Sequence, residues 1–198
     1  MMENNITNIF SGKKFAIFGS NKRTESIVSF LSKYDLDIVL IDDDKKIPNL
    51  TQFDLCVLAG WSKLIPKKDL EKPKYGFINC HAGKLPEYRG SSPMNWAILN
   101  NETKFGLSVI TVDESFDTGE ILVSREFDIS KEHLIGDLHA IANKNFPEMV
   151  IEAVVKKFLK LPGYAQPSNG SSYYPLRSSE DGKIDWYFDD AESISRKI

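Results

Sequence analysis

Short apolar runs alternate along the chain with amphipathic or turn-rich stretches. Four of these runs predict strands. They are residues 15–18, 38–41, 55–59 and 77–79. After the first run, Ile27, Phe30 and Leu31 recur at helical spacing and predict a helix. A β-α-β opening of this kind builds a parallel sheet with helices on its faces, so the expected fold class is α/β, a Rossmann-like, mostly parallel twisted sheet flanked by helices.

The second half of the chain continues this alternation. Residues 105–112 and 121–129 are rich in β-forming side chains and predict two strands joined by the loop 113–119. Apolar residues then recur at helical spacing from Leu134 to Leu161. Because a proline removes a helical hydrogen bond, we expect either one helix interrupted near Pro147 or two helices in succession. These helices are expected to supply packing surface.

The pattern divides the chain into three parts. Residues 1–12 are expected to be a loose N-terminal extension, residues 13–165 form the main α/β domain, and residues 166–198 are a loop-like segment that follows it. Asp189, with Glu192 three residues later, resembles a helix start near the end of the chain.

Composition narrows the class of protein. The chain has 198 residues, a formal net charge of -3 and no apolar run long enough to cross a membrane. It also lacks the layout of a secretory signal, so we expect a cytoplasmic protein with no membrane insertion. Its two cysteines provide no disulfide framework. The absence of a long Lys or Arg run argues against an extended nucleic-acid surface.

The turn after the first predicted strand, residues 19–23, has the sequence Gly-Ser-Asn-Lys-Arg. It lacks the second and third glycines that let a dinucleotide approach a helix start, which argues against a nicotinamide enzyme. The turn could bind an anion through its N–H groups and Lys22 or Arg23, but a solvated turn is the commoner outcome. We therefore leave it outside the predicted site.

Polar side chains follow the fourth predicted strand. In an extended segment alternate side chains share a face, so Asn79 and His81 can project together while Cys80 points back into the protein. An isolated Asn-x-His at a strand end usually finds only backbone partners. An amide and an imidazole beside a carboxylate such as Asp117 would suit acyl transfer, although spacing alone does not place Asp117 there.

Four segments together resemble the formyltransferase family that uses 10-formyltetrahydrofolate. They are Asn79-Cys80-His81, Leu85-Pro86 with Arg89-Gly90, the run Asp117-Thr118-Gly119-Glu120-Ile121-Leu122, and residues 59–65. The resemblance runs from about Lys14 to Trp186. It implies 10-formyltetrahydrofolate as formyl donor and makes residues 13–165 a formyltransferase catalytic domain with Asn79, His81 and Asp117 as catalytic residues. It also implies that a further C-terminal module, common in the family, is absent here.

The chemistry of formyl transfer fits these three residue types. The carbonyl oxygen becomes negative in the tetrahedral intermediate, and an Asn amide and a protonated His ring can donate hydrogen bonds to it. A carboxylate at Asp117 would favour the imidazolium form of His81. Asp117 could also accept the proton lost from the attacking amine, directly or through a water.

The family's folate pocket is implied at the end of the third predicted strand. The residues expected to bind the donor are Gly60, Trp61, Ser62, Leu64 and Ile65. Ligands in open α/β sheets gather beyond the carboxyl ends of the strands, where both this segment and His81 fall. The alternative is that the apolar side chains of this segment are ordinary core residues.

Neither a metal site nor a nucleophilic cysteine is expected. His133 and His139 have no neighbouring Cys or His pattern suited to a metal, and we interpret both as structural or solvated. Cys80 should face away from His81, and Cys56 lies in an apolar run, so neither is expected to act as a nucleophile.

The acceptor is inferred from the loop that begins at Arg89. Pro93 in this loop suits the first turn of a helix. The segment resembles the sugar-modifying and tRNA-modifying branches more than the purine-biosynthetic branch, which acts on glycinamide ribonucleotide. The residues expected to bind the acceptor are Arg89, Gly90, Ser91, Tyr174 and Arg177.

We expect the acceptor to be the amine of a nucleotide-linked amino sugar, a 4-amino-4,6-dideoxyhexose, used in surface polysaccharide (lipopolysaccharide O-antigen) biosynthesis. No nucleic-acid partner is expected, and a homodimer is possible. The alternatives are a methionyl-tRNA formyltransferase and a catalytically inactive folate-binding or regulatory module.

Overall fold

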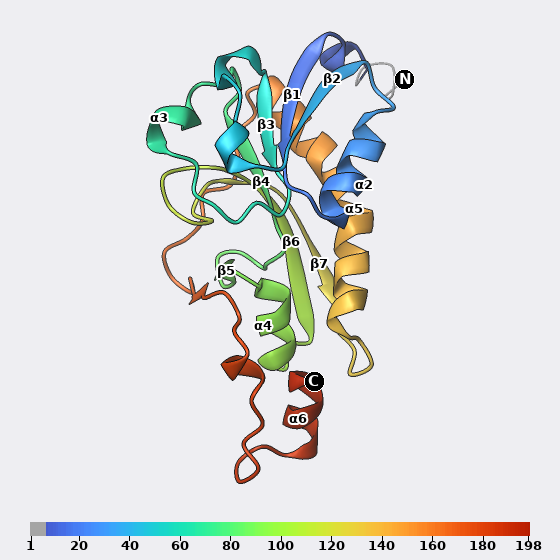
Figure 1. Cartoon of the computed structure of the whole chain (residues 1–198), viewed down its shortest axis with the longest axis vertical. Coiled ribbons are helices and arrows are strands. Elements are labelled where there is room, and N and C mark those ends of the chain that lie inside the picture. The colour runs from blue at the N-terminus through green and yellow to red at the C-terminus, as the bar shows by residue number, and fades with distance from the viewer. Residues whose placement is uncertain (1–6) are drawn as a thin grey trace.

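A six-stranded twisted sheet forms the centre of the molecule (Figure 1). The computed structural model describes residues 7–198. The strands lie in the order β2-β1-β3-β4-β6-β7. Their bounds are β1 Lys13–Phe18, β2 Leu36–Ile41, β3 Leu55–Leu58, β4 Phe77–His81, β6 Lys104–Thr111 and β7 Ile121–Asp128.

The sheet has a parallel part and an antiparallel part. Strands β2, β1, β3 and β4 pair in parallel, whereas β6 runs antiparallel to β4 and β7 runs antiparallel to β6. The α/β fold class is therefore confirmed, and the four apolar runs are the four parallel strands. The register sets Leu58 of β3 beside Asn79 of β4, so the expected donor segment and the Asn-x-His segment leave the sheet at the same edge.

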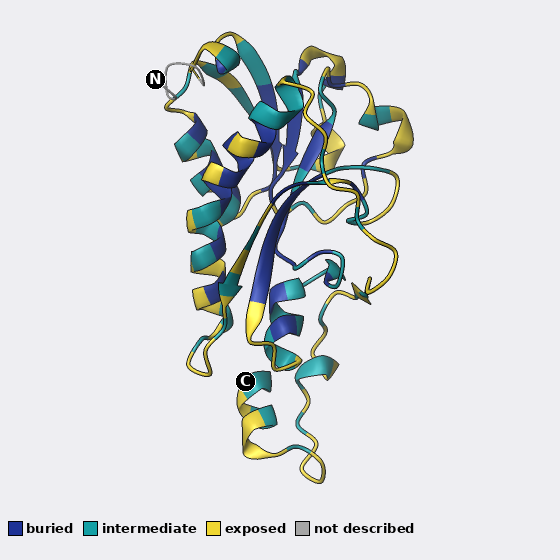
Figure 2. Cartoon of the chain, turned by 180° about the vertical axis from the view of Figure 1, so that it is seen from behind, coloured by how far each residue is buried: buried dark blue, intermediate teal, exposed yellow. Residues whose placement is uncertain are grey.

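Helices α2 (Lys22–Leu31) and α5 (Ile135–Phe158) lie against each other on one face of the sheet. The residues of β1 alternate between the two faces. Phe15 and Ile17 pack with the core beneath these helices, and Ala16 and Phe18 pack in a second core on the other face. Figure 2 shows the buried strands between the layers. Each fully buried large apolar side chain contributes about 1.5–3 kcal/mol to folding.

Helix α5 is continuous through Pro147, which corrects the expectation of an interrupted helix or of two helices. Pro147 is buried together with Phe146 and Met149, on the side of α5 that packs on the core. Tertiary packing of this apolar side therefore outweighs the one hydrogen bond that proline removes.

The N-terminal boundary also needs correction. Residues 1–6 of the expected loose extension lie outside the described residues, but Phe10 is completely buried. Its ring makes edge contacts with Phe15, Tyr34 and Phe158, so this part of the expected extension belongs to the core. Between residues 7 and 198, no helix has the length and apolar character needed to span a membrane.

Shorter elements connect the strands of the sheet or follow helix α5. They are η1 (Asp44–Lys46), η2 (Leu50–Gln52), α3 (Lys67–Leu70), β5 (Arg89–Gly90), α4 (Pro93–Leu99), β8 (Tyr173–Tyr174), η3 (Glu180–Gly182) and α6 (Ala191–Lys197). The segment after α5 crosses the molecule, and its strand β8 pairs with β5 before the chain reaches α6 beside α4. The expected helix start near Asp189 is α6, which Asp190 caps.

Candidate functional site

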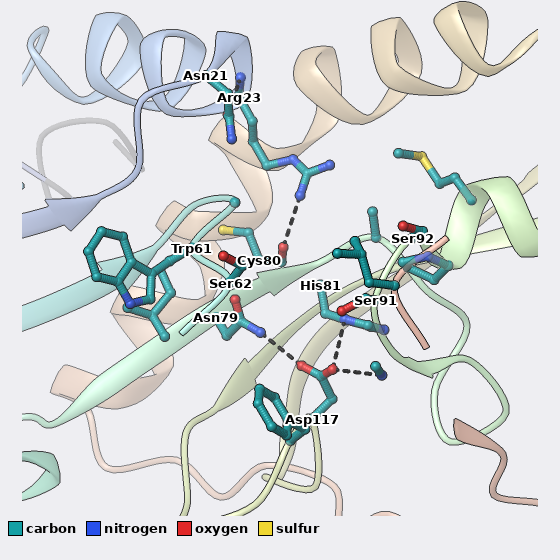
Figure 3. A pocket seen from close by; sticks show the side chains of 18 of the residues that line it. Asn21, Arg23, Trp61, Ser62, Asn79, Cys80, His81, Ser91, Ser92 and Asp117 are labelled. Carbon is teal, nitrogen blue, oxygen red and sulfur yellow. Dashed lines mark hydrogen bonds and ion pairs between the residues drawn. The ribbon is translucent and has the colours of Figure 1, made fainter. Parts of the chain in front are cut away.

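One carboxylate joins the polar residues that end β4 (Figure 3). Asn79 and His81 lie on β4, and Asp117 lies in the loop between β6 and β7. Asn79 Nδ2 donates to Asp117 Oδ1 at 3.0 Å, and His81 Nδ1 lies 3.4 Å from Asp117 Oδ2. The side chains of His81 and Asp117 are only 5% and 8% exposed, so solvent screens their interaction little. The structure thus brings together the three residues expected at the polar centre.

The ring of His81 is held from its other side as well. Nε2 lies 2.5 Å from the carbonyl oxygen of Tyr88, which can only accept, so Nε2 carries a hydrogen. Because Nδ1 faces a carboxylate, a doubly protonated ring satisfies both acceptors. Gly83 makes this contact possible, since a Cβ there would lie 2.4 Å from both His81 Nε2 and Tyr88 O. Sequence reasoning missed Gly83, and its only signal is a glycine two residues after the histidine.

The loop that carries Asp117 has an unusual backbone. Asp117 has a φ of 55°, in the left-handed region that Asp tolerates better than most residues. The backbone N–H of Gly90 donates to Asp117 Oδ2 at 2.9 Å. Gly90 has a φ of 93°, and a Cβ there would lie 2.2 Å from the carbonyl oxygen of Tyr174. Glycine at position 90 therefore lets the backbone lie close to Tyr174 in a conformation in which its N–H reaches the carboxylate.

A pocket of about 780 Å³ opens above these residues. Asn79, His81 and Asp117 all line it, together with residues from the starts of α2 and α4 and from the first half of α5. Its volume falls within the range of pockets that hold small molecules and cofactors. The arrangement can bind a folate-sized molecule next to an amide, an imidazole and a carboxylate.

The five residues expected to bind the donor all line this pocket. The ring of Trp61 packs edge-on against Phe18 at 5.3 Å, Ile65 is buried, and Leu64 is 49% exposed. Gly60 has a φ of 82°, and a Cβ there would lie 2.0 Å from Asn21 Nδ2. The segment therefore combines core packing with pocket lining, and its contact with a folate stays a prediction.

The residues expected to bind the acceptor separate into two groups. Gly90 and Ser91 line the pocket, whereas Arg89 is not among its lining residues. Arg89 directs its Nε and Nη2 at Oε1 of Gln166, at 3.0 and 2.8 Å.

Tyr174 and Arg177 also lie outside the described lining of this pocket. Tyr174 stacks on Tyr88 at a ring distance of 4.8 Å. Arg177 lines a second cavity, of about 420 Å³, and its Nη2 donates to the carbonyl oxygen of Lys197 at 3.1 Å. An acceptor in the first pocket is therefore expected to contact Gly90 and Ser91 before these side chains.

Helices α2 and α5 form a wall of the pocket that sequence reasoning left out. The guanidinium of Arg23 lies 4.8 Å from the ring centre of Phe146, and its Nη1 donates to the carbonyl oxygen of Cys80 at 3.3 Å. Burial lowers the pKa of Arg23, and burial followed by the charge of Arg23 lowers the pKa of His139. Within residues 7–198, the buried Nε of Arg23 and Oδ1 of Asn143 have no hydrogen-bond partner.

Cys80 takes part in this site through its backbone carbonyl oxygen, and its thiol is unsuited to act as a nucleophile. Burial raises the pKa of its thiol to about 12, with a smaller opposite effect from Arg23, so the thiolate is scarce at neutral pH. Burial raises the pKa of Cys56 to about 12 as well. Among the described residues, His, Cys, Asp and Glu side chains do not gather in a group of three that could hold a metal ion.

Comparison with known proteins finds related sequences and folds. The methionyl-tRNA formyltransferase of Syntrophus aciditrophicus (strain SB) is 35% identical over 146 residues, which cover 73% of this chain and 46% of the relative. This chain therefore spans about half the length of the curated relatives that it matches.

Two solved structures share the fold. HypX from Aquifex aeolicus in complex with tetrahydrofolic acid superimposes with a TM-score of 0.75 and 21% identity, covering 93% of this chain and 33% of that chain. The formyltransferase PseJ from Anoxybacillus kamchatkensis, in complex with UDP-4,6-dideoxy-4-formamido-L-AltNAc and tetrahydrofolate, superimposes with a TM-score of 0.73 and 24% identity. It covers 93% of this chain and 96% of that chain.

The family model described as "Formyl transferase" matches residues 7–154, the part of the chain that contains the whole six-stranded sheet and its polar centre. With this match and the identity to curated relatives, this chain belongs to the formyl transferase family.

Proposed function

We propose that this domain transfers the formyl group of 10-formyltetrahydrofolate to a primary amine. The observation that carries the proposal is the carboxylate of Asp117, which joins Asn79 and His81 at a pocket large enough for a folate. Membership of the formyl transferase family supports the reaction class. The tetrahydrofolate in the HypX and PseJ structures supports the donor.

The proposed chemistry begins with attack of the neutral amine nitrogen on the formyl carbon. A C–N bond forms while the carbonyl oxygen becomes an oxyanion. Asn79 donates only one of its two amide hydrogens to Asp117, so the second can stabilise that oxyanion. The two ring nitrogens of His81 face Asp117 and the carbonyl oxygen of Tyr88, so the imidazolium stabilises the oxyanion through its nearby positive charge. Asp117 accepts the proton released by the amine. The bond from the formyl carbon to N10 of the folate then breaks, and N10 takes up the proton that Asp117 accepted, which returns Asp117 to its carboxylate form.

The donor is proposed to lie along Trp61, Leu64 and Ile65. These side chains offer flat and branched apolar surface beside backbone polar groups, which is the usual composition of a small-molecule pocket. The indole N–H of Trp61 is buried without a partner among the described residues, so it is available to a polar edge of the pterin.

The acceptor is proposed to be a nucleotide-linked amino sugar of the 4-amino-4,6-dideoxyhexose class, used in surface polysaccharide biosynthesis. The described pocket lining contains three cationic side chains, Lys22, Arg23 and Lys63, and one carboxylate, Asp117. This excess suits ligands with phosphate or carboxylate groups. The chain as a whole carries a net charge of -3, which disfavours a long polyanion more than a single nucleotide diphosphate.

A second candidate is formylation of methionyl-tRNA. It is favoured by the sequence relatives, which are methionyl-tRNA formyltransferases with 33–36% identity to this chain. Because they match over less than half of their own length, their acceptor is carried over only as a hypothesis.

The test is to incubate the protein with 10-formyltetrahydrofolate and one acceptor at a time. The acceptors are nucleotide-linked 4-amino-4,6-dideoxyhexoses, initiator methionyl-tRNA and glycinamide ribonucleotide, with formylated products measured by mass spectrometry. Formylation of the amino sugar is expected. Formylation of the tRNA alone would establish the second candidate, and folate binding without any product would indicate a module that binds without turnover.

A further inference from the structure

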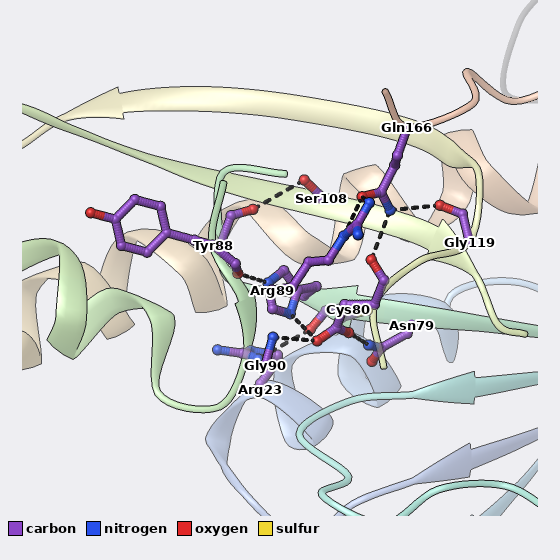
Figure 4. A network of polar contacts seen from close by, with 12 residues as sticks. Arg23, Asn79, Cys80, Tyr88, Arg89, Gly90, Ser108, Gly119 and Gln166 are labelled. Atoms are coloured by element: carbon purple, nitrogen blue, oxygen red, sulfur yellow. Dashed lines mark hydrogen bonds and ion pairs between the residues drawn. The ribbon is translucent and has the colours of Figure 1, made fainter. Parts of the chain in front are cut away.

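The amide of Gln166 is fully occupied by hydrogen bonds to the loop of Asp117 and to Arg89. Its Nε2 donates to the carbonyl oxygens of Asp117 at 2.8 Å and Gly119 at 2.7 Å (Figure 4). Its Oε1 accepts from Arg89 Nε at 3.0 Å and Nη2 at 2.8 Å. Two donors and two lone pairs are the whole capacity of this amide, so its orientation is determined on both sides.

Asp117 is consequently held at two points, its backbone by Gln166 and its carboxylate by Gly90. Arg89 orients Gln166, which binds the backbone of Asp117, and the N–H of the next residue, Gly90, donates to Asp117 Oδ2. The Arg89 contact is the two-pronged arrangement that guanidinium groups favour. The three residues together form what we call the Asp117 clamp, defined as Arg89, Gly90 and Gln166.

The Asp117 loop needs such a clamp for a physical reason. The left-handed backbone of Asp117 costs about 1 kcal/mol relative to ordinary conformations and persists only where its surroundings enforce it. The preceding residues 114–116 are exposed, and the contacts of their side chains are the surface ion pair of Glu114 with Lys67 and the ring contact of Phe116 with Tyr173. Without the two hydrogen bonds from Gln166, the loop could relax and move the carboxylate away from Asn79 and His81.

We infer that Gln166 and Arg89 are positioning residues, which act on the reaction by fixing the carboxylate of Asp117 against Asn79 and His81. This inference rests on the proposed function. It gives Arg89 a different task from the acceptor binding expected from sequence, because its guanidinium serves Gln166 outside the pocket lining. Displacement of a reacting group by about 1 Å can cost up to about 10²-fold in rate.

Two variants of Gln166 separate its contacts. Gln166→Leu removes every hydrogen bond of the amide, whereas Gln166→Glu keeps an acceptor for Arg89 but offers no donor to the loop carbonyls. Each is expected to lower kcat roughly 10- to 100-fold, while KM for the formyl donor changes little. Ser171→Ala is the matched control, because the Ser171 hydroxyl donates only to Ser168 in the same segment, and it should retain wild-type kcat.

Arg89→Lys and a double variant test whether Arg89 acts on Asp117 through Gln166. Lysine keeps the charge but cannot form the two-pronged contact, so kcat should fall, although less than in Gln166→Leu. If Arg89 acts through Gln166, then Arg89→Lys combined with Gln166→Leu should be no slower than Gln166→Leu alone. Additive losses, an increase in KM for the acceptor with unchanged kcat, or wild-type kcat in Gln166→Glu would each overturn the inference.

A measurement that needs no turnover keeps this inference separate from the proposed function. The ring nitrogen resonances of His81 should shift in Gln166→Leu and Gln166→Glu but not in Ser171→Ala, because the carboxylate beside Nδ1 moves. Thermal melting identifies any variant that fails to fold. If Gln166→Leu fails to fold, Gln166→Glu and Arg89→Lys provide the test in its place. Shifted resonances in a protein that formylates no acceptor would support the clamp and refute the reaction, whereas unshifted resonances would refute the clamp.

Discussion

Two walls of the same pocket differ in how completely their polar groups are paired. On one wall, Asp117 accepts from Asn79 and Gly90 and faces His81, while the His81 ring also reaches a backbone carbonyl. On the wall made by α2 and α5, the buried Nε of Arg23 and Oδ1 of Asn143 have no partner among the described residues.

This difference separates preorganised chemistry from binding capacity. A buried polar atom without a partner costs about 1–3 kcal/mol, so an unpaired wall is stabilised when a ligand supplies the missing partners. A paired wall holds its groups in place before any ligand arrives, which lowers the reorganisation needed during reaction. Substitutions in the first wall should therefore change rate, and substitutions in the second should change ligand affinity and local charge.

The largest effect is expected from removing a donor on the paired wall. Asn79→Ala and His81→Ala should each lower kcat about 10²–10³-fold, because Asn79→Ala removes a hydrogen-bond donor and His81→Ala removes a positive charge near the developing oxyanion. Single-turnover formylation measures the loss. His133→Ala is a matched control, since His133 lies in the second cavity and should leave the rate unchanged. Near-normal turnover in both site variants would remove these residues from the chemistry.

Gly83→Ala should have the next largest effect. The new Cβ would lie 2.4 Å from both His81 Nε2 and the backbone oxygen of Tyr88, so one of them must move. We expect overpacking to reduce the free energy of unfolding by about 1–3 kcal/mol and kcat to fall markedly. Denaturant unfolding and kcat measure the two changes. Gly136→Ala, where a Cβ meets nothing within 4 Å, should cause no loss of stability.

Arg23→Gln probes the unpaired wall through the pKa of His139. Burial and then the Arg23 charge lower that pKa, so removing the charge should raise it, as an NMR titration can measure. Lys22→Gln is the matched control and should leave the pKa of His139 unchanged. Because folding lowers the His139 pKa, its contribution to stability is present above about pH 6.5 and decreases as pH falls toward the folded pKa. Arg23→Gln should weaken that pH dependence, and an unchanged His139 titration would contradict the electrostatic coupling.

Trp61→Phe is expected to have the smallest effect. The indole N–H is buried without a partner among the described residues, so its removal loses no hydrogen bond and should not lower the free energy of unfolding. If the pterin accepts a hydrogen bond from this N–H, tetrahydrofolate affinity should fall about fivefold, the equivalent of one ordinary hydrogen bond. Isothermal titration measures the affinity, and unaltered binding would exclude that contact.

The spacing of apolar residues in the sequence was sufficient to predict the strands of the sheet. It did not predict that helix α5 continues through Pro147 or that Phe10 is buried. The runs that became β1, β3 and β4 bury side chains on both faces, and that requirement is local in sequence, whereas β2 at the edge of the sheet leaves Leu40 exposed. The sequence does not predict the environments of Pro147 and Phe10, because these come from packing partners distant in the chain, such as Phe158 for Phe10. A proline or a polar N-terminal stretch gives no signal of such partners.

The sequence by itself determined the α/β class, the alternation that directs Asn79 and His81 to one side of β4, and the motifs that identify the family. Only the tertiary structure decided that Asp117 lies between them, that Arg89 contacts Gln166, and that Arg23 borders the pocket. Hydrophobic periodicity reports burial one residue at a time. Hydrogen-bond partners far apart in the chain are fixed only when strands, loops and helices pack together, because orientation and distance decide those bonds.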